Sequence, residues 1–347
     1  PPHPRGTDYP GFFRTADDRI IFLLRSFIYP EILLRLMNVL DCGYQAASFA
    51  RAARRWHSEE LEAELARRKA VGVIARTREE WLAHPQGRWL AARPAVHIEK
   101  IGDGAAERLE PAPRPLSGLR VLDFTHVLAG PTTTRLLAEQ GADVLHVCPP
   151  WRQDPLALHL DSGWGKRCAL LDLEQPGEGD RLRAVLGSAD VFVQSWRPGA
   201  LERAGLGPRD IAAIRPGIIY VSVSCYGDGG PWRERGGFEP IGQTACGLAI
   251  DEGSAEEPRL APTGTVMVAG MNMWCWMLTA APGWAQANPA ARTAPAAMTA
   301  PPAASLPRRD ATKERIVLNV TMAISVSLPL PNGRTDARGL AAGRSIP

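Results

Sequence analysis

The sequence has little net charge, no paired cysteine motif and no long apolar run, and each absence excludes a class of protein. With 40 basic and 37 acidic residues the formal charge is only +3, which gives no general nucleic-acid footprint. The best membrane candidate, Met267 to Ala281, spans about 15 residues, whereas a transmembrane helix needs about 20. No secretory signal leads the chain. We therefore expect a protein that binds neither nucleic acid nor membrane.

The six cysteines show no C-x-x-C spacing, so we expect free thiols and a cytoplasmic or other reducing intracellular compartment. Cys148, Cys168 and Cys225 flank apolar strand-like runs, which predicts that these thiols are buried. No second His or Cys stands at metal-ligand spacing, and no metal site is expected. The sequence begins with Pro1 and no Met, so we expect a fragment or a processed chain.

Gly and Pro are abundant, at about 18% of the chain against a typical ~12%. This excess excludes a helical bundle or coiled coil as the whole structure. It fits either an α/β protein with many loops or a core that carries a low-complexity tail. Composition places a helix-rich block at 12–101, a linker at 102–115, a large domain at 116–281 and a disordered Ala/Pro-rich tail at 282–347.

The first block has recognisable local signals. Residues 19–24 read as a short buried strand, and the apolar spacing after Pro30 predicts a helix that stops near Gly43. Ser58 is a candidate cap for the next helix. Thr77 and Glu80 form a capping-box pair that predicts another helix start.

The large domain alternates strands and helices. Near-continuous apolar strands separated by helices indicate an α/β fold with a doubly wound, Rossmann-like parallel sheet that is covered on both faces. The expected strands are 119–124, 143–148, 168–173, 190–194 and 218–225.

The loop between the first of these strands and its helix, residues 125–131, lacks G-x-G-x-x-G, and no phosphate-binding P-loop is present. Ala129 and Gly130 would still let a ligand approach backbone N–H groups at the helix start, although a plain tight turn fits as well. His126 follows the strand, at the edge where α/β proteins bind ligands, or it serves a structural role. Trp196 and Arg197 follow another strand and suit an adenine or a phosphate, or a Trp that covers the core.

Longer segments resemble the class III CoA-transferases, which include the formyl-CoA, carnitine-CoA and bile-acid-CoA transferases. Five ordered blocks within roughly 118–250 carry the resemblance, which extends over about 12–266. They are Gly118-Leu-Arg-Val-Leu-Asp-Phe-Thr-His-Val-Leu-Ala-Gly-Pro131 with its following helix, 165–173, 189–203, 216–226 and 237–243.

The resemblance implies a Rossmann-like large domain that binds CoA, a small α+β domain and an interlocked homodimer. The family's small domain normally follows a large domain, whereas here it precedes one, so the resemblance suggests a longer, fused or tandem form. It implies CoA contacts at seven positions: His126, Ala129, Leu171, Asp172, Ser195, Trp196 and Arg203. Leu128 replaces a Gln of the formyl-CoA branch, which argues against that substrate.

The family's nucleophile is an Asp that attacks the acyl thioester. The matching position falls near Met267 and Val268, where no carboxylate stands. We expect a gene-model error, frameshift or truncation just before this point. Glu239 is a candidate substitute. The related α-methylacyl-CoA racemases have a His-Asp pair where Phe238 and Glu239 stand, and the missing His disfavours racemase chemistry.

The function expected from the resemblance is transfer of CoA from an acyl-CoA thioester to a carboxylate acceptor. CoA or acyl-CoA is then a substrate, and no metal or redox cofactor is implied. The alternatives are a non-catalytic CoA-binding remnant or truncated fragment and, third, a racemase-like isomerase.

Overall fold

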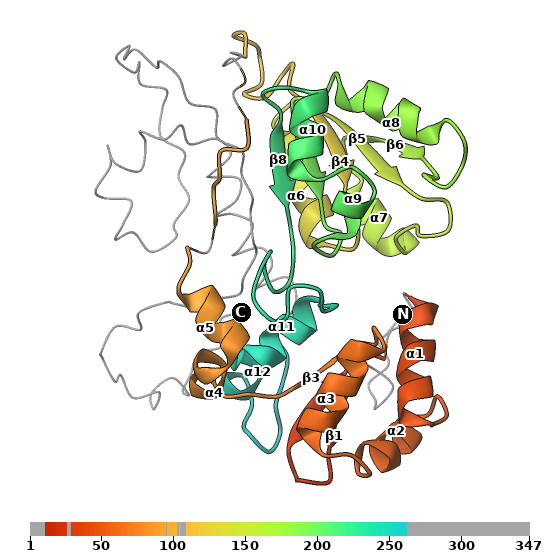
Figure 1. Ribbon diagram of the computed structural model, residues 1–347, viewed down its shortest axis with the longest axis vertical. Helices are drawn as coiled ribbons and strands as arrows, with labels where there is room; N and C mark the ends of the chain where they lie inside the picture. The colour runs from red at the N-terminus through yellow and green to blue at the C-terminus, as the bar shows by residue number, and fades with distance from the viewer. Residues whose placement is uncertain (1–10, 26–28, 95, 103, 105–108, 262–347) are drawn as a thin grey trace, which may run out of the picture.

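A computed structural model of the chain describes residues 11–25, 29–94, 96–102, 104 and 109–261. It contains a three-stranded and a five-stranded β-sheet, which Figure 1 places in the lower and upper halves of the molecule. The predicted tail and the segment around Met267 lie outside the described residues. Among the described residues, no helix combines the length and hydropathy needed to cross a membrane.

The lower sheet is antiparallel, in the order β1-β2-β3, and β2 is fully buried between its neighbours. Its strands are β1 (Gly11–Arg14), β2 (Ile20–Leu23) and β3 (Gly72–Ile74). The helices of this half are α1 (Pro30–Leu40), α2 (Ala46–Ala53), α3 (Ser58–Arg67), α4 (Arg78–Ala83) and α5 (Pro85–Ala91).

Local sequence signals in this half are largely confirmed. The helix predicted after Pro30 is α1, and its apolar residues Leu33, Leu36 and Leu40 are buried on one face. Thr77 and Glu80 form the predicted capping box at the start of α4. Ser58 is the first residue of α3 rather than its cap, because its hydroxyl donates to the Asp17 carboxylate at 2.7 Å.

The upper sheet is parallel, in the order β6-β5-β4-β7-β8. Helix α6 covers one face, and α8, α9 and α10 cover the other, which confirms the α/β fold. The strands are β4 (Arg120–Phe124), β5 (Asp143–Cys148), β6 (Lys166–Leu170), β7 (Val191–Gln194) and β8 (Ile219–Ser222). The helices are α6 (Ala129–Glu139), α7 (Leu156–Ser162), α8 (Glu178–Leu186), α9 (Ala200–Arg203) and α10 (Pro208–Ile214).

Two predicted strands differ in extent because both lie at sheet edges. Strand β6 ends at Leu170, since Asp172 starts a turn in which its carboxylate accepts the N–H of Glu174 at 2.9 Å. Strand β8 is shorter than 218–225, because it pairs only with the four residues of β7. The expectation that Cys168 is buried is wrong: it lies on edge strand β6 and is exposed.

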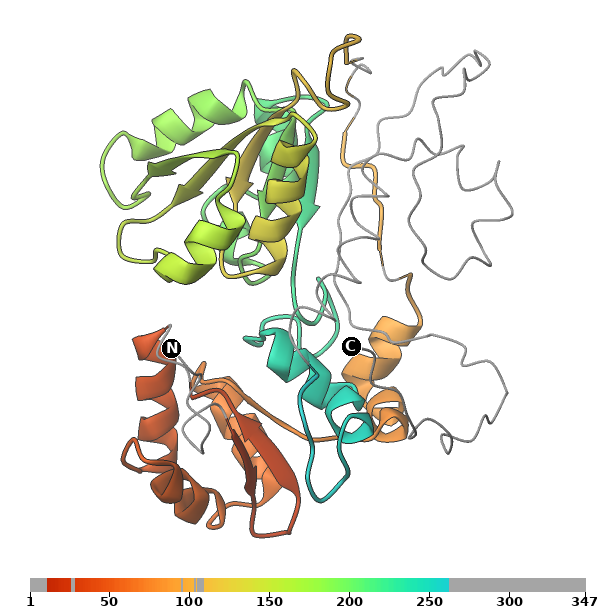
Figure 2. The same ribbon diagram turned by 180° about the vertical axis from the view of Figure 1, so that it is seen from behind.

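After β8 the chain returns to the lower half. Helices α11 (Glu239–Ala245) and α12 (Leu248–Asp251) lie beside α4 and α5 in both Figure 1 and Figure 2. Buried Gln86 of α5 binds the segment that precedes α11, because its amide donates to the Tyr226 carbonyl at 2.7 Å and accepts the Trp232 N–H at 2.8 Å. Residues 226–246 thus share a core with the N-terminal block. The predicted division into domains stays a prediction.

Candidate functional site

The five-stranded sheet has a topological switch point between β4 and β7. From β4 the chain crosses through α6 to β5 on one side, and β7 lies on the other side. Open α/β sheets bind ligands in the crevice at the carboxyl ends of two such strands. The loops that border this crevice are residues 125–128 and 195–199, and Figure 1 shows these strand ends directed toward the lower half.

Two predicted residues meet across the switch point. The Ser195 hydroxyl accepts the backbone N–H of His126 at 2.9 Å and lies 3.2 Å from the Nδ1 atom of the same residue. The Trp196 ring stands edge-on to the His126 ring, with centroids 5.3 Å apart. The structure therefore brings His126, Ser195 and Trp196 together, on loops that are about 70 residues apart in the sequence.

His126 is a neutral imidazole at neutral pH. Burial lowers its pKa to about 3, and the positive charges of Arg152 and Arg197 act in the same direction. A neutral ring carries one proton, so a Ser195 hydroxyl that donates to Nδ1 would leave Nε2 as a donor. This His is suited to hydrogen bonding rather than to carrying a charge.

Val127, the next residue of the loop, has a strained backbone with φ of +72°. A β-branched residue rarely adopts this left-handed conformation, which costs about 1–3 kcal/mol. Asp154 holds it in place, because one carboxylate oxygen accepts the Val127 N–H at 2.8 Å and the other accepts the Tyr29 hydroxyl at 3.1 Å. Burial raises the pKa of Asp154. The loop is thus tied to the start of α1.

Helix α6 begins at Ala129 directly after this loop, and Leu128 precedes it without a side-chain cap. The first backbone N–H groups of a helix have no partner within the helix, so they favour an anionic or polar ligand. Gly130 is required here, because a Cβ at this position would meet the Thr125 side chain at 2.4 Å. Ala129, a predicted contact, is half-buried at this helix start.

A buried cluster of charged side chains stabilises the 125–128 loop. The Asp123 carboxylate, fully buried in β4, lies 2.9 Å from Lys166 Nζ and 3.2 Å from His146 Nδ1. It also accepts the hydroxyls of Thr125 and Thr134 at 2.5 and 2.6 Å. Burial alone would raise the pKa of Asp123, but the two cations and the hydroxyls hold it well below its usual value. The cluster therefore joins Thr125, at the start of the loop, to Thr134 in α6.

Arg152 is a site residue that the sequence analysis did not identify. Its guanidinium carbon lies 5.2 Å from the ring centroids of both Tyr29 and Trp196. Arg152, Asp154 and Tyr29 were all missed. The available signal for Arg152 and Asp154 was their position directly after a predicted strand, the same rule that identified His126.

The remaining predicted CoA contacts follow other strands at the same edge of the sheet. Leu171 follows β6 and packs, like Trp196, against the core that α8 and α10 cover. Asp172 is engaged in its own turn, where it also accepts the Gln175 side-chain amide at 3.0 Å. Arg203 ends α9 and is exposed. These three residues make no direct contact with His126 among the described residues.

Glu239, the candidate substitute nucleophile, is the first residue of α11 and is half-buried. The Gln243 side-chain amide donates to its carboxylate. The preceding residue, Phe238, stacks on Tyr29 with centroids 5.8 Å apart, and Tyr29 in turn contacts Asp154. Phe238 thus links the start of α11 to the 125–128 loop through Tyr29 and Asp154. The Met267 position lies outside the described residues.

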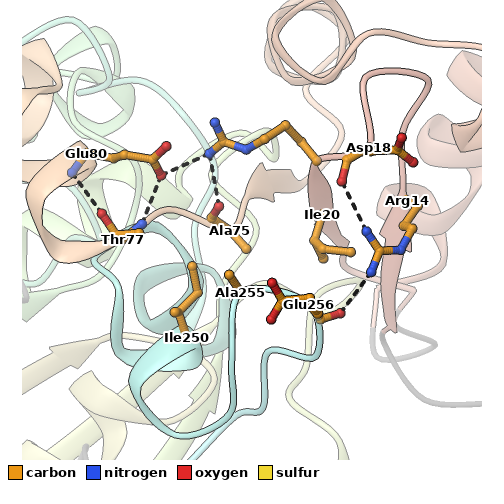
Figure 3. A pocket seen from close by; sticks show the side chains of 10 residues that line it. Arg14, Asp18, Ile20, Ala75, Thr77, Glu80, Ile250, Ala255 and Glu256 are labelled. Atoms are coloured by element: carbon orange, nitrogen blue, oxygen red, sulfur yellow. Dashed lines mark hydrogen bonds and ion pairs between the residues drawn. The ribbon is translucent and has the colours of Figure 1, made fainter.

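An open pocket lies elsewhere, between β1, β2 and the 250–256 segment (Figure 3). Its volume is about 260 Å³, below the ~300–1,000 Å³ of most ligand sites. The arginines that line it already have partners. Arg19 forms an ion pair with Glu80 at 3.0 Å, and Arg14 donates to the backbone carbonyls of Asp18 and Glu256. None of the predicted site residues lines it, so we do not place the functional site there. Among the described residues, no group of three or more His, Cys, Asp or Glu side chains is arranged to hold a metal ion.

Comparison with known proteins shows which family the sequence resembles. The model of CoA-transferase family III matches residues 116–283. The acetyl-coenzyme A transferase nodX of Hypoxylon pulicicidum is 43% identical over 152 residues, which is 42% of this chain and 26% of that protein. The succinyl-CoA–D-citramalate CoA-transferase of Chloroflexus aurantiacus is 35% identical over 158 residues, 42% of this chain and 39% of that protein.

A solved structure, that of the Mycobacterium tuberculosis protein Rv3272, is 30% identical with a TM-score of 0.43 and covers 49% of each chain. The chain thus spans less than half the length of these relatives. The matched segment begins just before β4 and includes the whole five-stranded sheet with the switch-point loops. Residues 116–283, just under half of the chain, thus match CoA-transferase family III, and the curated relatives that the chain resembles are named as CoA-transferases.

Proposed function

We propose that the chain binds an acyl-CoA in the switch-point crevice and takes part in the transfer of CoA from the thioester to a carboxylate acceptor. The observation that carries the proposal is the meeting of His126, Ser195 and Trp196 at the carboxyl ends of β4 and β7. This is the place where an open α/β sheet binds its ligand. The match of residues 116–283 to CoA-transferase family III suggests the class of reaction.

Each of these residues would contact a different part of the ligand. Trp196 offers an aromatic face, and the neutral His126 offers a donor for an oxygen of the ligand. The uncapped start of α6 at Ala129 suits a phosphate or a carbonyl oxygen. Leu171, Asp172 and Arg203 extend the surface along the sheet edge, where the exposed guanidinium of Arg203 suits the phosphates of CoA. A homodimer, expected from the family, stays a prediction.

Transfer requires a carboxylate nucleophile, and among the described residues we propose Glu239 for this role. Asp123 is ion-paired and fully buried, and Asp154 already accepts two hydrogen bonds. In the proposed reaction, the Glu239 carboxylate attacks the thioester carbonyl, the C–S bond breaks, and CoA leaves as a thiolate while the acyl group stays as a mixed anhydride.

The thiolate then attacks the enzyme-derived carbonyl of this anhydride, which releases the donor acid and forms a glutamyl thioester. The acceptor carboxylate attacks that thioester and expels the thiolate, giving a second anhydride. The returning thiolate attacks the acceptor carbonyl, which yields the new acyl-CoA and regenerates the carboxylate.

The test combines binding with trapping. The protein is incubated with acetyl-CoA or succinyl-CoA and then with hydroxylamine, and peptides are mapped by mass spectrometry. A hydroxamate on Glu239, absent from Glu239→Gln and retained in the exposed control Glu234→Gln, supports transfer chemistry. CoA binding without an adduct supports a non-catalytic CoA-binding protein instead. No CoA binding overturns the proposal.

A further inference from the structure

Tyr29 links the N-terminal block to the loops of the crevice. It directly precedes α1 and is only 4% exposed. Its hydroxyl donates to the Asp154 carboxylate at 3.1 Å, and its ring stacks on Phe238 with centroids 5.8 Å apart. The guanidinium carbon of Arg152 lies 5.2 Å from the centroid of the same ring. One side chain of the N-terminal block thus contacts both the loop after β5 and the residue before α11.

Two short series of contacts lead from Tyr29 to the loops at the ends of β4 and β7. Asp154 accepts the Tyr29 hydroxyl with one carboxylate oxygen and the backbone N–H of Val127, at 2.8 Å, with the other. The guanidinium carbon of Arg152 lies 5.2 Å from the centroids of both the Tyr29 and the Trp196 rings. Tyr29 is therefore separated from each of the two loops by a single side chain.

The first of these series ends on a strained backbone. Val127 is half-buried and β-branched, and its φ of +72° lies in the left-handed region. In the described part of the chain, the other non-glycine residues with positive φ are exposed and carry no branch at Cβ; they are Asp18, Asp41 and Lys69. A strained conformation persists only where its surroundings stabilise it, and such conformations are concentrated at functional sites.

The groups around Val127 are suited to stabilise it. Burial, together with the charge of Asp154, raises the pKa of the Tyr29 hydroxyl, which therefore stays protonated and donates. Both carboxylate oxygens of Asp154 are engaged, so its orientation depends on the N-terminal block. Val127 directly follows His126, whose ring contacts Trp196 in the crevice. The backbone conformation of Val127 thus sets how the chain runs from His126 to the start of α6.

We propose that Tyr29 and Asp154 are positioning residues for the ligand, which stabilise the left-handed conformation of Val127 and so keep the crevice in the shape that binds CoA. The N-terminal block therefore completes the CoA site. Docking of this block and binding of the ligand favour each other, because the coupling between two sites is reciprocal. The inference rests on the proposed function for the identity of the ligand.

Calorimetric titration of CoA into two variants tests the support. We expect Asp154→Ala to bind CoA about tenfold more weakly, because the loop relaxes and the ligand must restore the strained conformation. Tyr29→Phe keeps the ring contacts and loses only the hydrogen bond, so a loss of about threefold is expected. The control Tyr44→Phe, in the same block, should leave CoA affinity unchanged. Equal CoA affinities for Tyr29→Phe and wild type would overturn the proposal.

A rescue experiment separates positioning from general stabilisation. Glycine adopts positive φ without a steric penalty, so Val127→Gly added to Asp154→Ala should recover at least about threefold of the lost affinity. The matched control is Lys69→Gly, which relieves a φ of +57° at an exposed residue away from the crevice and should recover none. No recovery with Val127→Gly, or the same recovery with Lys69→Gly, would overturn the proposal. Circular dichroism confirms that each variant folds.

Hydrogen exchange without ligand distinguishes this inference from the proposed function. If the wild type binds no CoA, the proposed function fails, and the exchange rate of the Val127 amide then decides. Faster exchange in Tyr29→Phe than in the wild type supports the positioning of the loop by the N-terminal block, because Asp154 then holds this N–H less firmly. Equal exchange rates in the two proteins would overturn it.

Discussion

The Ser195 hydroxyl lies 3.2 Å from His126 Nδ1 and accepts the His126 backbone N–H at 2.9 Å. One short side chain thus joins the loops at the ends of two neighbouring strands. The strained backbone of Val127, the next residue, is held by Asp154 from a third loop. The crevice is consequently built before any ligand arrives, which lowers the entropy cost of binding.

Ser195→Ala should weaken CoA binding several-fold and lower the free energy of unfolding by about 1–3 kcal/mol, because the His126 N–H loses its partner. Calorimetric titration and urea unfolding measure the two effects. Ser188→Ala is the control: its hydroxyl donates to the Val185 carbonyl near the end of α8, away from the 125–128 and 195–199 loops, so CoA affinity should not change. Equal CoA affinities for the two variants would refute the role of Ser195.

Asp123→Asn should lower the free energy of unfolding by about 3–5 kcal/mol, because it leaves Lys166 and His146 buried without their counter-charge. Urea unfolding followed by circular dichroism measures the loss. Asp143→Asn is the matched control, since the Asp143–Arg167 pair is exposed and such pairs contribute at most about 1 kcal/mol. Similar losses for the two variants would contradict the account of the cluster.

Protein stability should depend on pH through His146. Burial opposes its protonation, but Asp123 prevails and raises the pKa of His146 to about 9, above the unfolded value of 6.5. The native state then binds a proton that the unfolded state has lost, so this contribution is complete below pH 6.5 and disappears as pH rises through 9.

Between pH 6.5 and 8 the free energy of unfolding should fall by on the order of 2 kcal/mol. In His146→Gln this slope should be largely absent, and urea unfolding at several pH values tests the difference. The opposite shift of His126, to about 3, acts only below pH 6.5 and does not interfere. A wild-type slope that survives in His146→Gln would assign the pH dependence to another group.

Much of the upper half could be predicted from the sequence. The five strands were predicted because buried parallel strands are near-continuous apolar runs, and β5 begins and ends where the pattern placed it. Strand β6 was shifted because it begins with the polar residues Lys166 and Arg167, whereas Leu171 and Leu173 continue the apolar run past its end at Leu170. Exposed edge strands leave no alternation that marks where they end.

The site was predicted only in part, for a physical reason. His126, Ser195 and Trp196 could be placed at one edge because each follows an apolar strand. The contacts of Arg152 with Tyr29, and of Asp154 with Tyr29, join segments more than 120 residues apart, and no local pattern encodes such a pairing. The packing of α11 and α12 on the N-terminal block was missed for the same reason.

The central claim is that CoA binds at the junction of the β4 and β7 loops, and calorimetric titration of CoA into the wild type and two tryptophan variants tests it most directly. We predict saturable binding to one site, a loss of about tenfold or more in Trp196→Ala, as base–aromatic stacking contributes about 1–3 kcal/mol, and no change in Trp164→Ala, whose ring is 70% exposed on the surface. Circular dichroism confirms that both variants fold. No CoA binding by the wild type, or equal binding by both variants, would contradict the account.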